Sequence, residues 1–258
     1  MFFEGKIQQA HPEKHLKSIV SLAVVDVKYI FLYVNIGCQG RISNGGVFNN
    51  CELNDKIQNN ALNIPEPTAL PARTEEVPFY FVGDEAFALS ENMMKVYSGY
   101  HERSSKERLY NYRLCRARRV MENAFGLLSA VFIVLRKPML LEPKTATSVV
   151  TAITLLHNFL RKGNNAHVYT PAGSLDEEIN GIVRLGNWRE SNNDMASILP
   201  LEIRPRRASR TAHNIRSEVA EYCIQEGSVS WQENYAYNKT YRICCGNRCR
   251  YFYPVETS

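Results

Sequence analysis

Two apolar runs near the start of the sequence constrain the fold most. Residues 18–27 (SIVSLAVVDV) form a continuous β-branched stretch, and residues 29–36 (YIFLYVNI) form a second apolar run. A run that is apolar on both faces is typical of a strand buried inside a sheet. The link between the two runs is short and polar, as a hairpin turn requires. The sequence therefore predicts a buried strand paired with a second strand.

Helices and further strands alternate along the rest of the chain. The predicted elements are a short helix near residues 47–58, strands over 78–83 and 131–135, and helices over 109–129, 145–162 and 211–225. The helix over 109–129 has the strongest pattern, because its apolar residues recur at alternating spacings of three and four. Paired strands followed by alternating strands and helices indicate an α/β protein with a mixed sheet flanked by helices.

Composition and charge narrow the class of protein. The 258 residues are 45% hydrophobic and 22% charged, which is typical of a folded chain and not of a disordered one. The net charge of +5 is compatible with nucleic-acid binding without requiring it. No apolar run is long enough for a membrane span and no secretory leader is visible, so no membrane partner is expected. The cysteines are odd in number and show no disulfide framework, which favours a reducing compartment.

Two acidic residues occupy positions suited to phosphodiester chemistry. Asp84 follows a hydrophobic strand, and Glu122 lies in the strongest predicted helix, beside its apolar stripe. Cleavage of DNA by two divalent metal ions requires carboxylates from different elements at one place. Spacing alone also allows simpler interpretations. An acid after a strand is commonly a solvated turn residue, and Glu122 can pair with Arg118 or Arg119 on the helix surface.

Several ordered blocks of the sequence resemble the DDE superfamily domain of Harbinger/PIF transposases and of the nuclease derived from them. The blocks are SIVSLAVVDVKYIFLYVNIGCQGRISNGGVFNN, VPFYFVGDEAFALSENMMKVYSG, LYNYRLCRARRVMENAFGLLSAVFIVLRKPM and ITLLHNFLRKG, followed by the shorter YTPAG, GNWRE and EGSVSWQ. The resemblance covers most of residues 18–231. It implies an RNase H-like fold, a divalent metal cofactor (Mg²⁺ or Mn²⁺), DNA as substrate, and a location in the nucleus with the cytoplasm as a second place.

The resemblance also implies which residues hold the metal ions. The family uses an Asp on the first strand, an Asp at the end of the fourth strand, and a Glu on a late helix. The second acid matches Asp84 in FVGDEAF, and the third matches Glu122 in RARRVMENAFG. The segment that carries the first acid is not recognisable, so the first strand is expected to be missing or degenerate. Glu4 is the nearest substitute, and an N-terminally truncated sequence is the alternative explanation.

Three regions follow from this comparison. Residues 1–17 are expected to be a degenerate remnant of the first catalytic strand, residues 18–165 the endonuclease domain, and residues 166–258 a partly helical C-terminal extension with a Tyr- and Cys-rich end. Because one of the three acids is not in place, three interpretations stay open. They are a metal-dependent DNA endonuclease, a non-catalytic DNA- or partner-binding protein descended from a transposase, and a transposon relic. A Myb-like partner is expected to supply DNA recognition and nuclear import.

The remaining charged and polar candidates have a functional and a structural interpretation each. Arginines near Glu122 can contact DNA phosphates or be solvated helix charge; they are Arg113, Arg116, Arg118 and Arg119. His157 is expected to be buried and hydrogen-bonded to backbone, in preference to acting as a ligand. Asp26 is expected to be structural, and Asn44 to be a turn or helix-cap residue.

The aromatic and cysteine residues of the extension are interpreted structurally. Trp188 and Trp231 are expected to anchor the extension on the catalytic domain. A zinc finger is not expected at the C-terminal cysteines because they lack the paired spacing of its ligands; they are Cys244, Cys245 and Cys249. The Arg-rich segment 204–210 is a candidate linker or nuclear-import signal.

Overall fold

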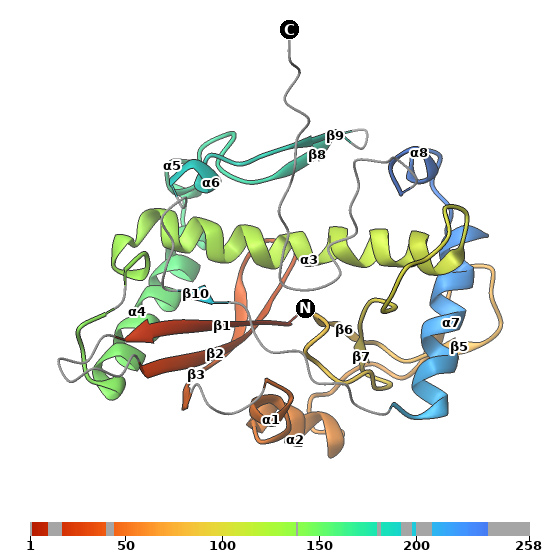
Figure 1. Cartoon of the computed structure of the whole chain (residues 1–258), viewed down its shortest axis with the longest axis horizontal. Coiled ribbons are helices and arrows are strands. Elements are labelled where there is room, and N and C mark those ends of the chain that lie inside the picture. The colour runs from red at the N-terminus through yellow and green to blue at the C-terminus, as the bar shows by residue number, and fades with distance from the viewer. Residues whose placement is uncertain are drawn as a thin grey trace, which may run out of the picture. The chain divides into compact units, whose positions relative to one another are not determined.

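The computed structural model describes residues 2–9, 17–39, 44–137, 139–179, 182–191, 198–199 and 208–236. Helices and small sheets together build the described chain, as expected for a protein of mixed α and β structure (Figure 1). The chain divides into two compact units, each formed from two stretches of sequence. Unit 1 takes residues 1–63 and 118–204, and unit 2 takes residues 64–117 and 205–258.

Unit 1 contains a four-stranded sheet in the order β10-β1-β2-β3 (Figure 1). Every pairing in this sheet is antiparallel; its strands are β1 (Phe2–Gln9), β2 (Lys17–Val25), β3 (Phe31–Gln39) and β10 (Ile198–Leu199). The described strands do not form the single mixed sheet that the sequence predicts. Their parallel pairing lies in a separate two-stranded sheet of unit 2, formed by β6 (Phe81–Val82) and β7 (Met93–Met94).

The first strand is not missing, because residues Phe2–Gln9 form β1; that its sequence is a degenerate remnant of the family's first catalytic strand stays a prediction. β1 is eight residues long and pairs with β2 from Phe2 opposite Val24 to Gln9 opposite Lys17. Strand pairing uses the backbone N–H and C=O groups, which every non-proline residue supplies. A segment can therefore lose its family-specific side chains and keep its place in the sheet.

The turn between β2 and β3 confirms the predicted hairpin and the structural role of Asp26. The Asp26 Oδ1 atom accepts hydrogen bonds from the backbone N–H groups of Lys28 (2.8 Å) and Ile30 (2.9 Å). Tyr29 has a φ of 65°, the left-handed conformation that this tight reversal requires. The side chain of Asp26 is thus committed to the turn.

Three predicted elements differ from the structure. The strand expected over 78–83 is reduced to β6, residues Phe81–Val82. The helix expected near 47–58 is two helices, α1 (Asn44–Asn49) and α2 (Glu52–Gln58), and α1 begins at Asn44, where a turn or cap residue was expected. The strand expected over 131–135 was wrong: the chain leaves a helix at Val131 and forms a 3₁₀ helix, η1 (Ile133–Leu135). A short apolar run does not distinguish a strand from a helical segment.

The long helices occur where the sequence predicts them. α3 (Lys106–Val131) contributes residues 106–117 to unit 2 and residues 118–131 to unit 1. α4 (Pro143–Lys162) packs on β3 in unit 1, and α7 (Arg210–Ile224) lies in unit 2. None of the helices in the described ranges combines the length and apolar character of a membrane span.

α4 is joined to the strand hairpin by two side chains as well as by apolar packing. Asn158 binds both backbone groups of Phe31: Oδ1 accepts from the N–H (2.9 Å) and Nδ2 donates to the carbonyl (2.8 Å). His157 is fully buried and contacts the Tyr29 carbonyl oxygen (2.8 Å) and the Tyr169 hydroxyl (2.7 Å). His157 is thus the buried, backbone-bonded histidine that the sequence predicts.

Each unit has its own apolar core. The unit 1 core is formed by β2, β3, α3, α4 and the segment after α3; its buried members are Ala23, Val25, Phe31, Met121, Ala124, Leu128, Leu135, Met139, Ala146, Val150 and Ile153. The main unit 2 core joins α3 to α7; its buried members are Val77, Val96, Leu109, Tyr110, Tyr112, Leu114, Val219, Ala220, Cys223 and Ala236.

The smaller elements complete the two units. Unit 1 also holds α5 (Ala166–Tyr169), the hairpin of β8 (Glu177–Ile179) with β9 (Ile182–Arg184), and α6 (Trp188–Ser191). Unit 2 holds β4 (Thr68–Ala69) paired with β5 (Glu76–Val77), and α8 (Gln232–Ala236).

Candidate nuclease site

Asp84 lies in unit 2, two residues after the end of β6, and follows Gly83. Its residue surface is 9% exposed, and its Oδ1 atom accepts a hydrogen bond from the backbone N–H of Ala86 (2.7 Å). Gly83 precedes it because a side chain would not fit there: an added Cβ would lie 2.8 Å from the Met93 sulfur and 3.1 Å from the Phe87 ring. Asp84 is therefore a buried and oriented turn residue, in contrast to the solvated turn residue of the simplest interpretation.

Lys95 is a neighbour of Asp84 to which the sequence pattern alone did not point. Its ammonium group donates to the Glu85 carbonyl oxygen (3.3 Å). Burial lowers the pKa of Lys95, the Glu85 and Asp84 carboxylates oppose this shift, and the Arg216 guanidinium adds to it. No sequence pattern marked Lys95, because β7, the strand that it follows, is only two residues long and is defined by its pairing with β6.

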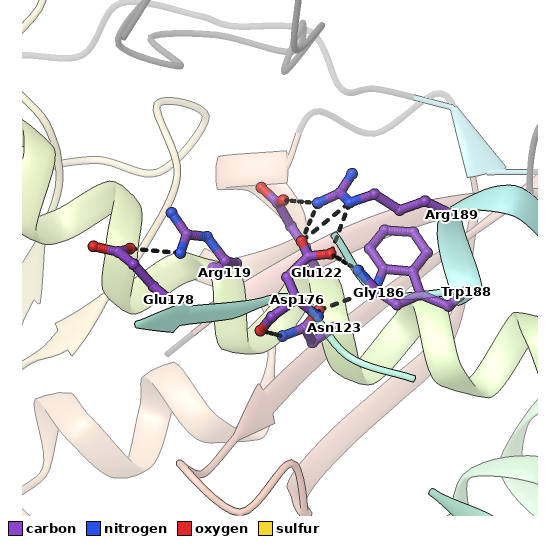
Figure 2. A network of polar contacts seen from close by, with 8 residues as sticks. All are labelled: Arg119, Glu122, Asn123, Asp176, Glu178, Gly186, Trp188 and Arg189. Carbon is purple, nitrogen blue, oxygen red and sulfur yellow. Dashed lines mark hydrogen bonds and ion pairs between the residues drawn. The ribbon is translucent and has the colours of Figure 1, made fainter. Parts of the chain in front are cut away.

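Glu122 lies in unit 1, on α3, where Arg189 of α6 reaches it. The distance between Arg189 Nη2 and Glu122 Oε2 is 3.5 Å, and about a fifth of each side chain is exposed (21% and 22%). Arg189 also binds Asp176, whose two carboxylate oxygens accept from Nε at 2.9 and 3.0 Å and whose Oδ2 accepts from Nη2. Figure 2 shows the Arg189 guanidinium extending toward both carboxylates.

The residues around Arg189 form a segment that docks on α3. We define this docking segment as residues 174–179 and 182–191. The Asn123 side chain forms two hydrogen bonds with the Asp176 backbone. Its Nδ2 donates to the carbonyl oxygen (3.0 Å), and its Oδ1 accepts from the N–H (2.9 Å). The Trp188 indole N–H donates to the same Oδ1 atom (3.0 Å), and Gly126 makes room for the ring, because an added Cβ would lie 2.2 Å from it.

A buried ion pair completes the docking. Arg119 Nη1 lies 2.6 Å from Glu178 Oε2, and the two side chains are 8% and 4% exposed. Arg119, Asn123 and Gly126 are spaced by four and three residues, so they lie on one face of α3. These three members of the RARRVMENAFG block therefore have a structural explanation that is separate from the Glu122 chemistry, and Trp188 anchors the extension as expected.

The arginines proposed as phosphate contacts are engaged within the protein. In unit 2, Arg113 Nε donates to Gln232 Oε1 (3.0 Å), and the Arg116 guanidinium carbon lies 4.0 Å from the centroid of the Trp231 ring. Trp231 in turn meets Tyr112 edge-on, which confirms it as an anchor. Arg113, Arg116 and Arg119 are therefore not the solvated helix charge of the simpler interpretation, whereas contact of any of the four with DNA stays a prediction.

The carboxylates have the donor chemistry of a magnesium or manganese site. Hard divalent ions prefer carboxylate oxygens, which Asp84 and Glu122 both supply, and Glu122 already accepts a cationic group. Among the described side chains, no three His, Cys, Asp or Glu residues come together as a metal-binding group. Glu4 lies opposite Leu22 in the sheet, and its side chain is outside the described ones. The C-terminal cysteines and residues 204–207 are also outside the described ranges.

The comparison with protein families identifies the class of protein to which the chain belongs. The family model of the DDE superfamily endonuclease matches residues 6–158. This match spans more than half of the chain, and the protein belongs to the DDE superfamily endonuclease family. No curated protein and no solved structure is significantly similar to it. Asp84 and Glu122 both lie inside the matched region, whereas the docking segment lies beyond it.

Proposed function

We propose that the protein is a metal-dependent DNA endonuclease of Harbinger/PIF transposase origin, with an RNase H-like catalytic domain. The observation that carries the proposal is the family match over residues 6–158, which includes both candidate carboxylates. The family generally uses divalent metal ions, and its nuclease class implies a DNA substrate. Neighbouring donors also contact both carboxylates: the Ala86 N–H binds Asp84, and Arg189 Nη2 lies 3.5 Å from Glu122 Oε2.

The proposed roles follow from the chemistry of the side chains. Asp84 and Glu122 hold the metal ions (Mg²⁺ or Mn²⁺), and Glu4 on β1 is the third acid. When bound, such ions activate water and stabilise the leaving oxygen of a phosphodiester. The Ala86 N–H donates to the Oδ1 atom of Asp84 and so orients this carboxylate. Arg118 and its neighbouring arginines are the proposed phosphate contacts.

The test is nicking of supercoiled plasmid by the full chain in Mg²⁺ or Mn²⁺. Asp84→Asn keeps the oxygen that accepts from Ala86, and Glu122→Gln keeps the side-chain length. Each substitution therefore removes the negative charge and changes the shape of the side chain very little. We expect each to lower the nicking rate by about two orders of magnitude or more. Asp26→Asn is the matched control, because that acid serves the β2–β3 turn. Equal nicking by the wild type and Asp84→Ala or Asp84→Asn would refute the proposal.

A non-catalytic protein is the second candidate, and one observation favours it. The position proposed for the first acid carries Glu4 in place of the family's Asp. A site that lacks one of three ligands binds metal weakly. This candidate predicts DNA or partner binding that Asp84→Asn leaves unchanged, with no nicking by the wild type. A relic without a role predicts, in addition, that the expressed chain does not unfold cooperatively.

A Myb-like partner and a nuclear location are part of the proposal. The partner would supply sequence recognition and import, as the resemblance implies. Co-expression with and without a Myb-domain protein of the same genome, followed by imaging of the tagged chain, tests both points. Nuclear accumulation that requires the partner is expected.

A further inference from the structure

The docking segment contains a buried carboxylate that the proposed chemistry does not use. The Asp176 side chain has 0% exposure, and its Oδ1 atom accepts from the Gly186 N–H (2.8 Å) in addition to Arg189. Gly186 is required for this approach, because an added Cβ would lie 2.5 Å from the Ser174 carbonyl oxygen. A buried charge of this kind is stable only when it is paired and hydrogen-bonded. Asp176 is therefore placed to hold Arg189.

Arg189 is, as a result, a cation fixed beside Glu122. Its fork binds Asp176 through Nε and Nη2, and its guanidinium carbon lies 4.3 Å from the centroid of the Trp188 ring. The ring is itself held by Asn123. From this position Nη2 reaches Glu122 Oε2 at 3.5 Å (Figure 2). The charge of Arg189 is balanced by Asp176, so the pair offers little net repulsion to a metal ion at Glu122.

We propose that Arg189 is a positioning residue that orients the Glu122 carboxylate for metal binding. The inference rests on the proposed function, because it takes Glu122 as a metal ligand. A glutamate on a partly exposed helix face otherwise samples several side-chain conformations, and a metal ion must select one of them. Partners that orient a metal ligand commonly change metal affinity by about 10- to 100-fold when they are removed. Asp176 holds Arg189, and Arg189 in turn holds Glu122.

The experiment measures Mn²⁺ binding to the full chain from the loss of the free-ion EPR signal, with nicking as a second readout. Arg189→Ala is expected to raise the half-saturating Mn²⁺ concentration about 10-fold, while nicking at saturating Mn²⁺ falls much less. Arg189→Lys keeps the charge but loses the planar fork, so it should resemble Arg189→Ala. Arg184→Ala is the matched control. It removes the same charge from an exposed position in the same segment and should bind Mn²⁺ as the wild type does.

The outcomes separate this inference from the proposed function. If the wild type binds no Mn²⁺, the proposed function fails and the inference fails with it. If the wild type binds Mn²⁺ and Arg189→Ala binds it equally well, only the inference fails. The same holds if Arg184→Ala loses as much Mn²⁺ affinity as Arg189→Ala does. Wild-type affinity in Arg189→Lys would also overturn it, because charge alone would then suffice. Should Arg189→Ala not fold, the double variant Asp176→Asn with Arg189→Met leaves no unpaired buried charge, and the same loss of about 10-fold is expected.

Discussion

At the scale of single residues, His157 shows how burial fixes the protonation state of a side chain. The Tyr29 carbonyl oxygen can only accept, so His157 Nε2 carries the proton and donates to it. Nδ1 then accepts from the Tyr169 hydroxyl. Burial lowers the pKa of His157 to about 4, the hydrogen bond to Tyr29 opposes the shift, and Arg161 adds to it. Burial also raises the pKa of Tyr169, which keeps its hydroxyl a donor.

This residue predicts a loss of stability in mild acid. The pKa of His157 falls from its ordinary value of 6.5 to about 4 in the folded chain. The unfolded chain therefore binds more protons between these values, so the contribution of His157 is present above pH 6.5 and declines as the pH falls toward 4. Between pH 7 and pH 5 the free energy of unfolding should fall by about 2 kcal/mol through His157.

Urea unfolding of the wild type and His157→Gln at both pH values measures this effect. The variant should lack that part of the pH dependence, whereas His167→Gln, at an exposed histidine of the same unit, should retain it. An unchanged pH dependence in His157→Gln would show that His157 is not the group responsible.

At the scale of elements, the sequence predicts what depends on local pattern and misses what depends on distant contacts. The predicted helices that contain Glu122 and His157 were confirmed, because each has a long stripe of apolar residues on one face. The position of Glu122 followed from the family resemblance. Arg189 was not singled out, because its contact with Glu122 joins residues 67 positions apart. The backbone contacts of Asn123 with Asp176 likewise join residues 53 positions apart.

The docking of Trp188 on α3 predicts the sign of a glycine substitution. Gly126→Ala inside an exposed helix would stabilise it by about 1 kcal/mol. Here the added Cβ would lie 2.2 Å from the Trp188 ring, so Gly126→Ala should destabilise the chain by about 1–3 kcal/mol. In a Trp188→Ala background the space opens, and the same substitution should become neutral or stabilising. Thermal or urea unfolding of the four proteins measures this, and a stabilising Gly126→Ala in the wild-type background would contradict the docking.

At the scale of the whole molecule, the division into units follows packing and not sequence order. Residues 64–117 separate two stretches of unit 1, and unit 2 is completed only by residues from 205 onward. The family resemblance places the end of the endonuclease domain at residue 165. This domain boundary stays a prediction. Which segments pack together depends on contacts across the chain, which local composition does not encode.

The proposed function is testable with a double variant. Asp84 belongs to unit 2 and Glu122 to unit 1, and the proposal assigns both to one set of metal ions. The effects of Asp84→Asn and Glu122→Gln on nicking should not add, because residues that serve one reaction act as a unit and either loss removes most of the rate.

The measurement compares initial nicking rates of the two single variants and the double variant, and urea unfolding checks that each variant is folded. The double variant should nick at about the rate of the slower single variant. Combining Asp84→Asn with the turn variant Asp26→Asn provides the control, which should nick as Asp84→Asn alone does. A double-variant rate equal to the product of the two separate losses would mean that Asp84 and Glu122 act independently, and the shared metal chemistry proposed for them would be wrong.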